Sequence, residues 1–377
     1  MGDLVGFTRC AGDGRWAINS RKWGDEVTKN PYEGQPAQAF WRSAAVELEP
    51  LAISGVWRPK FDIPKEAKIV TAGSSFAQNI SHHLRQAGYS WFDAEPAPPN
   101  LSLELQRQHG YGIFSFRTGN IYTSALLRQW VAWASGAGTP PDEIWRLGAR
   151  FYDPFRPVVQ PNGFATPEEL LASRGQTLAS IRRAMREADI WLFTFGLTEG
   201  WWNADSGAIY PMCPGTVAGE FDQGKHLFVN FDYAKVREDL EAAFDMIKKE
   251  NPAVRFLVTV SPVPLTATAS GEHALTANTY SKSILRAVAG DVARCRPDTD
   301  YFPGYELITG IPFRSMHYEE NLRNVTPVGV SFVMRSFFDG LSDARSRRDE
   351  ENLAERGLSE DDFDLACEDE LLDAFDG

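Results

Sequence analysis

The chain has 377 residues, of which 43% are hydrophobic and 24% are charged, a composition typical of a protein with a packed core. Its formal net charge of −13 argues against non-specific nucleic-acid binding, which needs a basic surface, and against a polybasic lipid anchor. The four cysteines lie far apart with no CxxC pair, which predicts free thiols. No apolar run is long enough to span a membrane and MGDLVGFTRC lacks a signal-peptide core, so we expect a cytoplasmic protein.

Residues 1–64 are irregular and rich in aromatic side chains, and only Gln38–Leu48 has helical spacing. Such a segment cannot bury its aromatic residues by itself. We therefore expect an irregular N-terminal arm, residues 1–64, that packs on the main domain.

The pattern changes to α/β at residues 67–84, AKIVTAGSSFAQNISHHL. Lys68–Ala72 predicts a buried strand, Gly73-Ser74-Ser75 a tight turn, and the spacing from Phe76 a helix. This switch presents a serine hydroxyl at the carboxyl edge of a sheet, beside the unpaired N–H groups that open a helix. An exposed oxygen nucleophile beside such donors is what acyl transfer needs, whereas the simpler interpretation makes Ser74 or Ser75 a helix N-cap.

Further elements follow in alternation and predict residues 65–341 as one α/β domain. Continuous apolar runs of this kind are typical of parallel strands that are covered on both faces. The expected strands are Tyr89–Phe92, Phe114–Phe116, Ile190–Phe195, Val254–Val260 and Asp300–Phe302, and the expected helices are Tyr122–Ala134, Thr166–Glu187, Asp232–Glu250, Thr279–Cys295 and Thr326–Leu341. Ile144–Tyr152 stays unassigned, and the Gly- and Pro-rich Asn203–Asn230 is expected to be a loop insertion.

Residues 342–377 form a tail of different composition. From Leu358 onward it carries nine acidic residues and no basic ones, with apolar side chains interleaved. Such a stretch is typical of a solvated tail, or of a short acidic amphipathic helix that docks on a protein partner or on its own body.

Small or polar residues directly follow several of the predicted strands. These strand ends are Gly73-Ser74-Ser75, Gly119-Asn120, Gly196-Leu197-Thr198-Glu199 and Ser261-Pro262. Ligands of open α/β sheets bind outside the carboxyl ends of the strands, so we expect these turns to converge on one crevice.

The octet TAGSSFAQ resembles the signature that gives the GSCFA family its name. The likeness extends from about Asn30 to Phe338 through NPYEGQPAQAFWR, FRTGNIYT, FTFGLTEGWW, TVSPVPLTATA, SKSILRA, YFPGYE and RNVTPVGVSFVM. The family is similar to the SGNH, or GDSL-like, hydrolases. That resemblance implies a three-layer α/β/α, flavodoxin-like fold with a mostly parallel sheet, and ester chemistry without a cofactor or metal.

The resemblance also implies roles for individual residues. It makes Ser75 the nucleophile, with Ser74 as the alternative, and assigns Gly119, Asn120, Gly196 and Thr198 to the oxyanion and substrate-binding loops. The GSCFA signature has cysteine where this chain has Ser75. The asparagine that donates to the oxyanion in SGNH enzymes is replaced here by Thr198.

The histidine base of the SGNH enzymes has no counterpart at the matching place. Their Asp-x-x-His block reads Asn321-Leu322-Arg323-Asn324 here, and an asparagine side chain cannot take up a proton near neutral pH. His317 is the first candidate for a replacement base, unless it is a surface histidine in a loop. Glu199 is the second, either with a raised pKa or as an ion-pair partner of Arg117.

Other side chains are candidates to line the crevice. Tyr305 and Glu306 of FPGYE come after the last strand, and Trp201 and Trp202 could stack on a sugar, although core packing is the favoured interpretation for both.

Three functional hypotheses result. The first is an SGNH-like ester hydrolase or O-acyltransferase that acts on a glycan or a similar polar small-molecule substrate. The second is a catalytically silent protein that binds a glycan or another small ligand in the same crevice. The third is a scaffold whose acidic tail recruits a protein partner.

Overall fold

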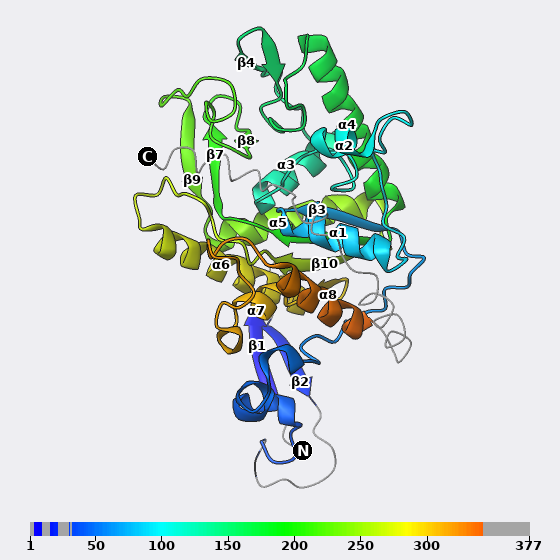
Figure 1. Ribbon diagram of the computed structural model, residues 1–377, viewed down its shortest axis with the longest axis vertical. Helices are drawn as coiled ribbons and strands as arrows, with labels where there is room; N and C mark the ends of the chain where they lie inside the picture. The colour runs from blue at the N-terminus through cyan, green and yellow to red at the C-terminus, as the bar shows by residue number, and fades with distance from the viewer. Residues whose placement is uncertain (1–3, 10–15, 22–29, 31, 342–377) are drawn as a thin grey trace.

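The computed structural model describes residues 4–9, 16–21, 30 and 32–341 (Figure 1). Its centre is a sheet of four strands in the order β11-β10-β6-β3, and each neighbouring pair is parallel. The strands are β3 (Ile69–Gly73), β6 (Ile190–Phe195), β10 (Arg255–Val260) and β11 (Thr299–Tyr301). The predicted mostly parallel α/β fold is confirmed.

Alternation along each strand divides the core into two layers. Trp191, Phe193 and Phe195 of β6 face one cluster of buried side chains, whereas Ile190 and Leu192 face the other. This is the period-2 geometry of a strand, and because both faces are apolar, both need a helical cover.

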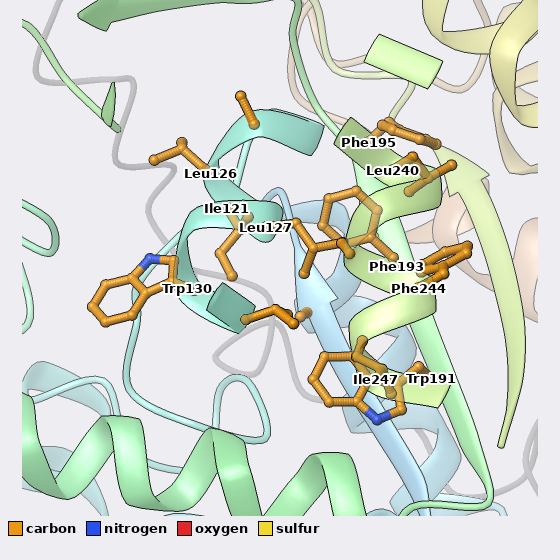
Figure 2. Close-up of a cluster of buried hydrophobic side chains, with 14 of the residues drawn as sticks. Ile121, Leu126, Leu127, Trp130, Trp191, Phe193, Phe195, Leu240, Phe244 and Ile247 are labelled. Carbon is orange, nitrogen blue, oxygen red and sulfur yellow. The ribbon is translucent and has the colours of Figure 1, made fainter. Parts of the chain in front are cut away.

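Helices cover both faces of the sheet. The first face carries α3 (Ser124–Ser135), α5 (Tyr233–Glu250) and α6 (Ala274–Cys295), and the second carries α1 (Phe76–Gln86), α7 (Gly304–Thr309) and α8 (Pro327–Leu341). Figure 2 shows side chains of α3 and α5, among them Leu127 and Phe244, packed around Trp191 and Phe193 of β6. Together with the sheet, these helices make three layers.

The outer edge of β3 is covered by irregular chain rather than by another strand. The backbone of Ile69 bonds to Ser90 and Phe92, and the backbone of Thr71 bonds to both the backbone and the side chain of Ser115. Instead of the predicted strands at 89–92 and 114–116, the structure has a single bridge, between Ile69 and Trp91. These bonds satisfy the edge that a parallel sheet would otherwise expose.

A second sheet includes part of the segment that was predicted to be a loop. Strands β7 (Glu199–Asn203), β8 (Ile209–Tyr210) and β9 (His226–Asn230) form an antiparallel sheet in the order β8-β7-β9. The loop prediction for 203–230 is therefore wrong for β8 and β9. Figure 1 shows β7 and β9 extending away from the central sheet beyond the end of β6.

The remaining elements are short, apart from one long helix. Helix α4 (Pro167–Glu187) begins where Thr166 accepts the Glu169 N–H, as predicted. The others are α2 (Leu103–Gln108), the hairpin of β4 (Trp145–Leu147) and β5 (Arg150–Tyr152), the pair β1 (Leu4–Arg9) and β2 (Trp16–Arg21), and short turns of helix at Ala37–Ala39, Arg42–Val46, Pro50–Ala52 and Ile311–Phe313.

In the described part of the N-terminal segment, the residues from about Leu51 onward pack on the domain. Trp57 is 6% exposed and contacts Phe302 and Phe337, and Lys60 donates to carbonyl groups of Arg296 and Thr299. Further upstream, Tyr32 and Trp41 are exposed, at 74% and 63%. The acidic stretch 358–377 lies outside the described residues.

The structure also bears on the predictions of no membrane span and of free thiols. Among the described residues, no helix combines the length and the apolarity needed to cross a bilayer. Cys213 carries the expected free thiol, whose pKa burial raises to about 11, but Cys295 is disulfide-bonded, so the prediction of free thiols is wrong at that position.

Candidate functional site

The turn between β3 and α1 is pressed against β6. Gly73 has a φ of +133°, and a Cβ atom there would lie 2.3 Å from the Thr194 carbonyl oxygen. The next N–H, of Ser74, donates to that same oxygen at 3.0 Å. Only glycine fits such a position, and the serine turn is consequently fixed to the end of the neighbouring strand.

A second turn bridges the ends of β3 and β6. The Ile121 N–H donates to the Gly73 carbonyl at 2.8 Å, and the Tyr122 carbonyl accepts the N–H groups of Gly196 and Leu197 at 2.9 and 3.0 Å. Main-chain bonds therefore bring together three of the predicted strand ends, although they lie far apart in the sequence. Gly119 and Asn120 directly precede this bridge, and Asn120 is 2% exposed.

The two serines of the turn occupy different environments. Ser74 is 3% exposed, and its Oγ is buried without a hydrogen-bond partner among the described residues. Ser75 is half-buried and directly precedes α1, but its side chain accepts no capping hydrogen bond from that helix. The structure thus gives the N-cap interpretation of Ser75 no support, and Ser75 is the more accessible hydroxyl.

Thr198 is fully buried beside this turn with both of its donors engaged. Its N–H donates to Ser281 Oγ at 3.0 Å, and its hydroxyl donates to Asn230 Oδ1 at 2.7 Å. In this arrangement the hydroxyl proton points to β9, so its predicted role as an oxyanion donor requires the Asn230 bond to break.

Two consecutive residues of α6 bind the β6–β7 turn, and neither was predicted to belong to the site. Ser281 is the acceptor for Thr198, and Lys282, which is 1% exposed, donates from Nζ to the Gly196 carbonyl at 2.7 Å. The sequence feature that could have indicated them is the SKSILRA block, because both residues lie near the start of the predicted helix Thr279–Cys295.

Glu199 is half-buried at the start of β7. Its Oε1 accepts the Thr268 hydroxyl at 2.7 Å, which connects β7 to the loop that follows β10. Burial raises the pKa of the Glu199 carboxyl, and the charge of Glu272 acts in the same direction, whereas the hydrogen bonds from Thr268 and Ala269 oppose the shift. Of the two alternatives for Glu199, the structure has the one with a raised pKa, because Arg117 pairs with Glu95 instead.

His317 is an enclosed residue rather than a surface one. It is 0% exposed, its ring lies against Phe313 and Phe332, and neither ring nitrogen has a hydrogen-bond partner among the described residues. Burial lowers the pKa of this imidazole. The interpretation of His317 as a surface histidine is therefore wrong.

Asn321 and Asn324, the positions predicted to correspond to an Asp-x-x-His block, lie in a turn before α8. Asn321 is exposed, and its Oδ1 accepts the N–H groups of Arg323 and Asn324, both at 2.9 Å. The Asn324 carbonyl in turn accepts the Glu319 N–H at 2.8 Å. These contacts are structural, of the kind that Asn makes in turns.

The other predicted lining residues have defined local partners. Arg117 is 6% exposed and lies over the Tyr111 ring with Glu95 at 3.9 Å. A further set of side chains is engaged in packing or in hydrogen bonds, namely Trp201 against Phe221 and Phe228, Tyr305 against the first core cluster, and Glu306 with Tyr301 and Arg286. Trp202 is 37% exposed. Within the part of the chain that the structure describes, no group of His, Cys, Asp and Glu is arranged to hold a metal ion.

Comparison with known proteins gives one result. No curated protein and no solved structure matches this sequence significantly. The model of the GSCFA family matches residues 68–337, which spans the central sheet, both helical layers and all of the strand ends described above. Since that match covers well over half of the sequence, the chain belongs to the GSCFA family.

Proposed function

We propose that this protein is an acyl-ester hydrolase or O-acyltransferase that uses Ser75 as its nucleophile. The observation that carries the proposal is the main-chain connection of three distant turns, in which Ser74 bonds to Thr194, Ile121 to Gly73, and Gly196 to Tyr122. These bonds gather a hydroxyl, two glycine turns and the start of a helix at one edge of a parallel sheet. Active sites of open α/β folds lie at this edge.

Ser75 is favoured over Ser74 because a nucleophile must reach its substrate. Ser74 is almost completely enclosed, whereas Ser75 is half-buried beside the first turn of α1. The N–H groups of Ala77 and Gln78 donate to the carbonyls of Ser74 and Ser75, both at 2.9 Å. The donor at the start of α1 that a developing oxyanion next to Ser75 would meet is therefore the Phe76 N–H.

Glu199 is the proton acceptor in this proposal. The carboxyl is partly accessible, and its raised pKa brings it nearer to the operating pH, as general bases require. The Ser75 hydroxyl would lose its proton to Glu199 and form a bond to the ester carbonyl carbon, after which the alcohol leaves with a proton returned by Glu199. Water or an acceptor hydroxyl would then take the acyl group from Ser75.

A polar acylated substrate, such as an O-acylated glycan, suits the surroundings of this edge. Trp201 is packed, but Trp202 keeps an exposed ring next to Leu227 on the β7–β9 sheet, and sugars stack on exposed aromatic rings. In this proposal the protein works in the cytoplasm without a cofactor.

The test is covalent labelling with a fluorophosphonate probe, followed by identification of the labelled peptide. We expect labelling of the wild type, loss of labelling in Ser75→Ala, and retention in the matched control Ser74→Ala. The variants Glu199→Gln and His317→Phe distinguish the two candidate bases, because removal of the true base slows the reaction by about 10²–10⁴-fold. No labelling at Ser75 in the folded wild type would contradict the proposal.

A catalytically silent ligand-binding protein is the second candidate. It is favoured by the two asparagines at the positions of the Asp-x-x-His block, which serve the turn, and by the enclosure of His317 between two phenyl rings. Saturable binding of an acylated sugar, with no turnover of p-nitrophenyl acetate and no labelling, would support this alternative. Recruitment of a protein by the acidic tail stays a prediction, which pull-downs with and without residues 342–377 would test.

A further inference from the structure

Lys282 is a buried lysine at the same edge of the sheet. It is one of the largest fully buried side chains, at 1% exposure, and it reaches from α6 to donate to the Gly196 carbonyl at 2.7 Å. Its neighbour Ser281 accepts the Thr198 N–H, so consecutive residues of one helix hold the turn between β6 and β7.

Gly196, the residue that Lys282 holds, also lies against the serine turn. A Cβ atom on Gly196 would lie 3.0 Å from Ser74 Cβ, and the Gly196 and Leu197 N–H groups both donate to Tyr122. The peptide between Gly196 and Leu197 is thus fixed at its carbonyl by Lys282 and at its N–H by Tyr122. A single peptide unit separates the ammonium group from the backbone that touches Ser74.

A lysine is an unusual choice for this contact. Any neutral donor could hold a carbonyl group, whereas removing an ammonium group from water costs several kcal/mol even after the surroundings relax. In the low dielectric of a protein interior, such a charge also acts more strongly on its surroundings than it would in water. Groups that stabilise developing charge in enzymes are fixed in this way before the reaction begins.

We propose that Lys282 is a positioning residue of the Ser75 site. It holds the Gly196 turn in place, and its charge, acting through that turn, stabilises the negative charge that develops on the substrate oxygen during attack by Ser75. This inference rests on the proposed function. Lys282 would thus act in place of the Thr198 hydroxyl, which is engaged with Asn230.

The test measures phosphonylation of Ser75, in which the Ser75 Oγ–P bond forms, the P–F bond breaks and the proton passes to the base. The variants are Lys282→Gln, which keeps a neutral donor, Lys282→Met, which removes the donor, and Lys282→Arg, which keeps the charge. Lys249→Met, on the exposed face of α5, is the matched control. Urea denaturation shows whether each variant is folded.

The saturating labelling rate and the apparent probe affinity are determined separately. We expect Lys282→Gln to lower the saturating rate by about tenfold or more while the affinity changes little, Lys282→Arg to recover most of the rate, and the control to match the wild type. If Lys282→Gln is folded and is labelled at the wild-type rate, the charge has no role and the inference is overturned, even if Lys282→Met fails to fold. Absence of labelling in the wild type would overturn the proposed function, and this inference with it.

Discussion

Substitution of Gly73 by alanine tests whether close contact between β3 and β6 builds the site. An added Cβ would lie 2.3 Å from the carbonyl oxygen of Thr194 and 2.6 Å from its nitrogen, and both are backbone atoms within the sheet. These atoms cannot rotate away as the end of a side chain can. The strands must therefore separate, and the bond from the Ser74 N–H to Thr194 must lengthen or break.

The expected cost has two parts. The left-handed backbone at φ +133° is strained for any L-residue, by about 1–3 kcal/mol. Forcing extra atoms into a packed interior adds about 1–3 kcal/mol. Together they predict a loss of about 4 kcal/mol in the free energy of unfolding, a large part of the roughly 5–15 kcal/mol that stabilises a native protein.

Urea unfolding followed by circular dichroism measures this loss. The matched control is Gly136→Ala, because Gly136 also has a positive φ, +82°, but has open space around its would-be Cβ. The control should cost only about 1–2 kcal/mol, from the backbone strain alone. Equal losses in the two variants would refute the reasoning, because the contact with β6 would then contribute nothing.

Two further predictions concern buried polar groups. Asp153→Ala should destabilise the protein by about 3–5 kcal/mol, because buried Arg156 and Arg174 then lose their carboxylate partner. The control Arg186→Ala, which removes a surface ion pair with Glu250, should cost less than about 1 kcal/mol. Similar unfolding midpoints of the two variants in urea would contradict this prediction. Burial lowers the pKa of the His317 imidazole, so as the pH falls the unfolded chain binds a proton at this residue before the folded protein does. The contribution of neutral His317 to the free energy of unfolding is therefore complete above the unfolded pKa of about 6.5, and it is lost as the pH falls toward the folded pKa. His317→Phe should therefore flatten the decline of unfolding free energy between about pH 7 and pH 5, and an unchanged slope would show that the imidazole does not contribute.

The β3–α1 unit was predictable from the sequence because its signals are local. A strand of five buried residues, a glycine turn and a helix with apolar spacing succeed one another within residues 67–84. The same holds for β6, β10, α4, α5 and α8, whose lengths and caps follow the periodicity of the chain. Helix α6 begins at Ala274, five residues before the predicted start, because the His273 side chain accepts the Leu275 N–H in place of a usual cap.

The second sheet was not predictable because its signals are not local. Strand β8 has only two residues, and β9 pairs with β7 across more than twenty intervening residues that are rich in Gly and Pro. Short strands of this kind are stabilised by pairing and burial rather than by propensity.

The contacts between side chains in the candidate site could not be predicted from the sequence either. Lysine in an amphipathic helix normally faces solvent, and nothing near Lys282 in the sequence indicates that it meets a carbonyl 86 positions away. Arg117 and Glu199 both follow predicted strand ends, but the structure pairs Arg117 with Glu95 and Glu199 with Thr268. The sequence thus locates the turns, whereas the contacts between them follow from tertiary packing.

The bridge from Gly73 through Ile121 and Tyr122 to Gly196 consists wholly of peptide groups. A change of the side chain at position 75 does not remove a peptide group, so the hydrogen bonds of the surrounding turns do not depend on which side chain that position has. The same scaffold can therefore carry cysteine in place of Ser75, with sulfur exchanged for oxygen and the surrounding turns unchanged.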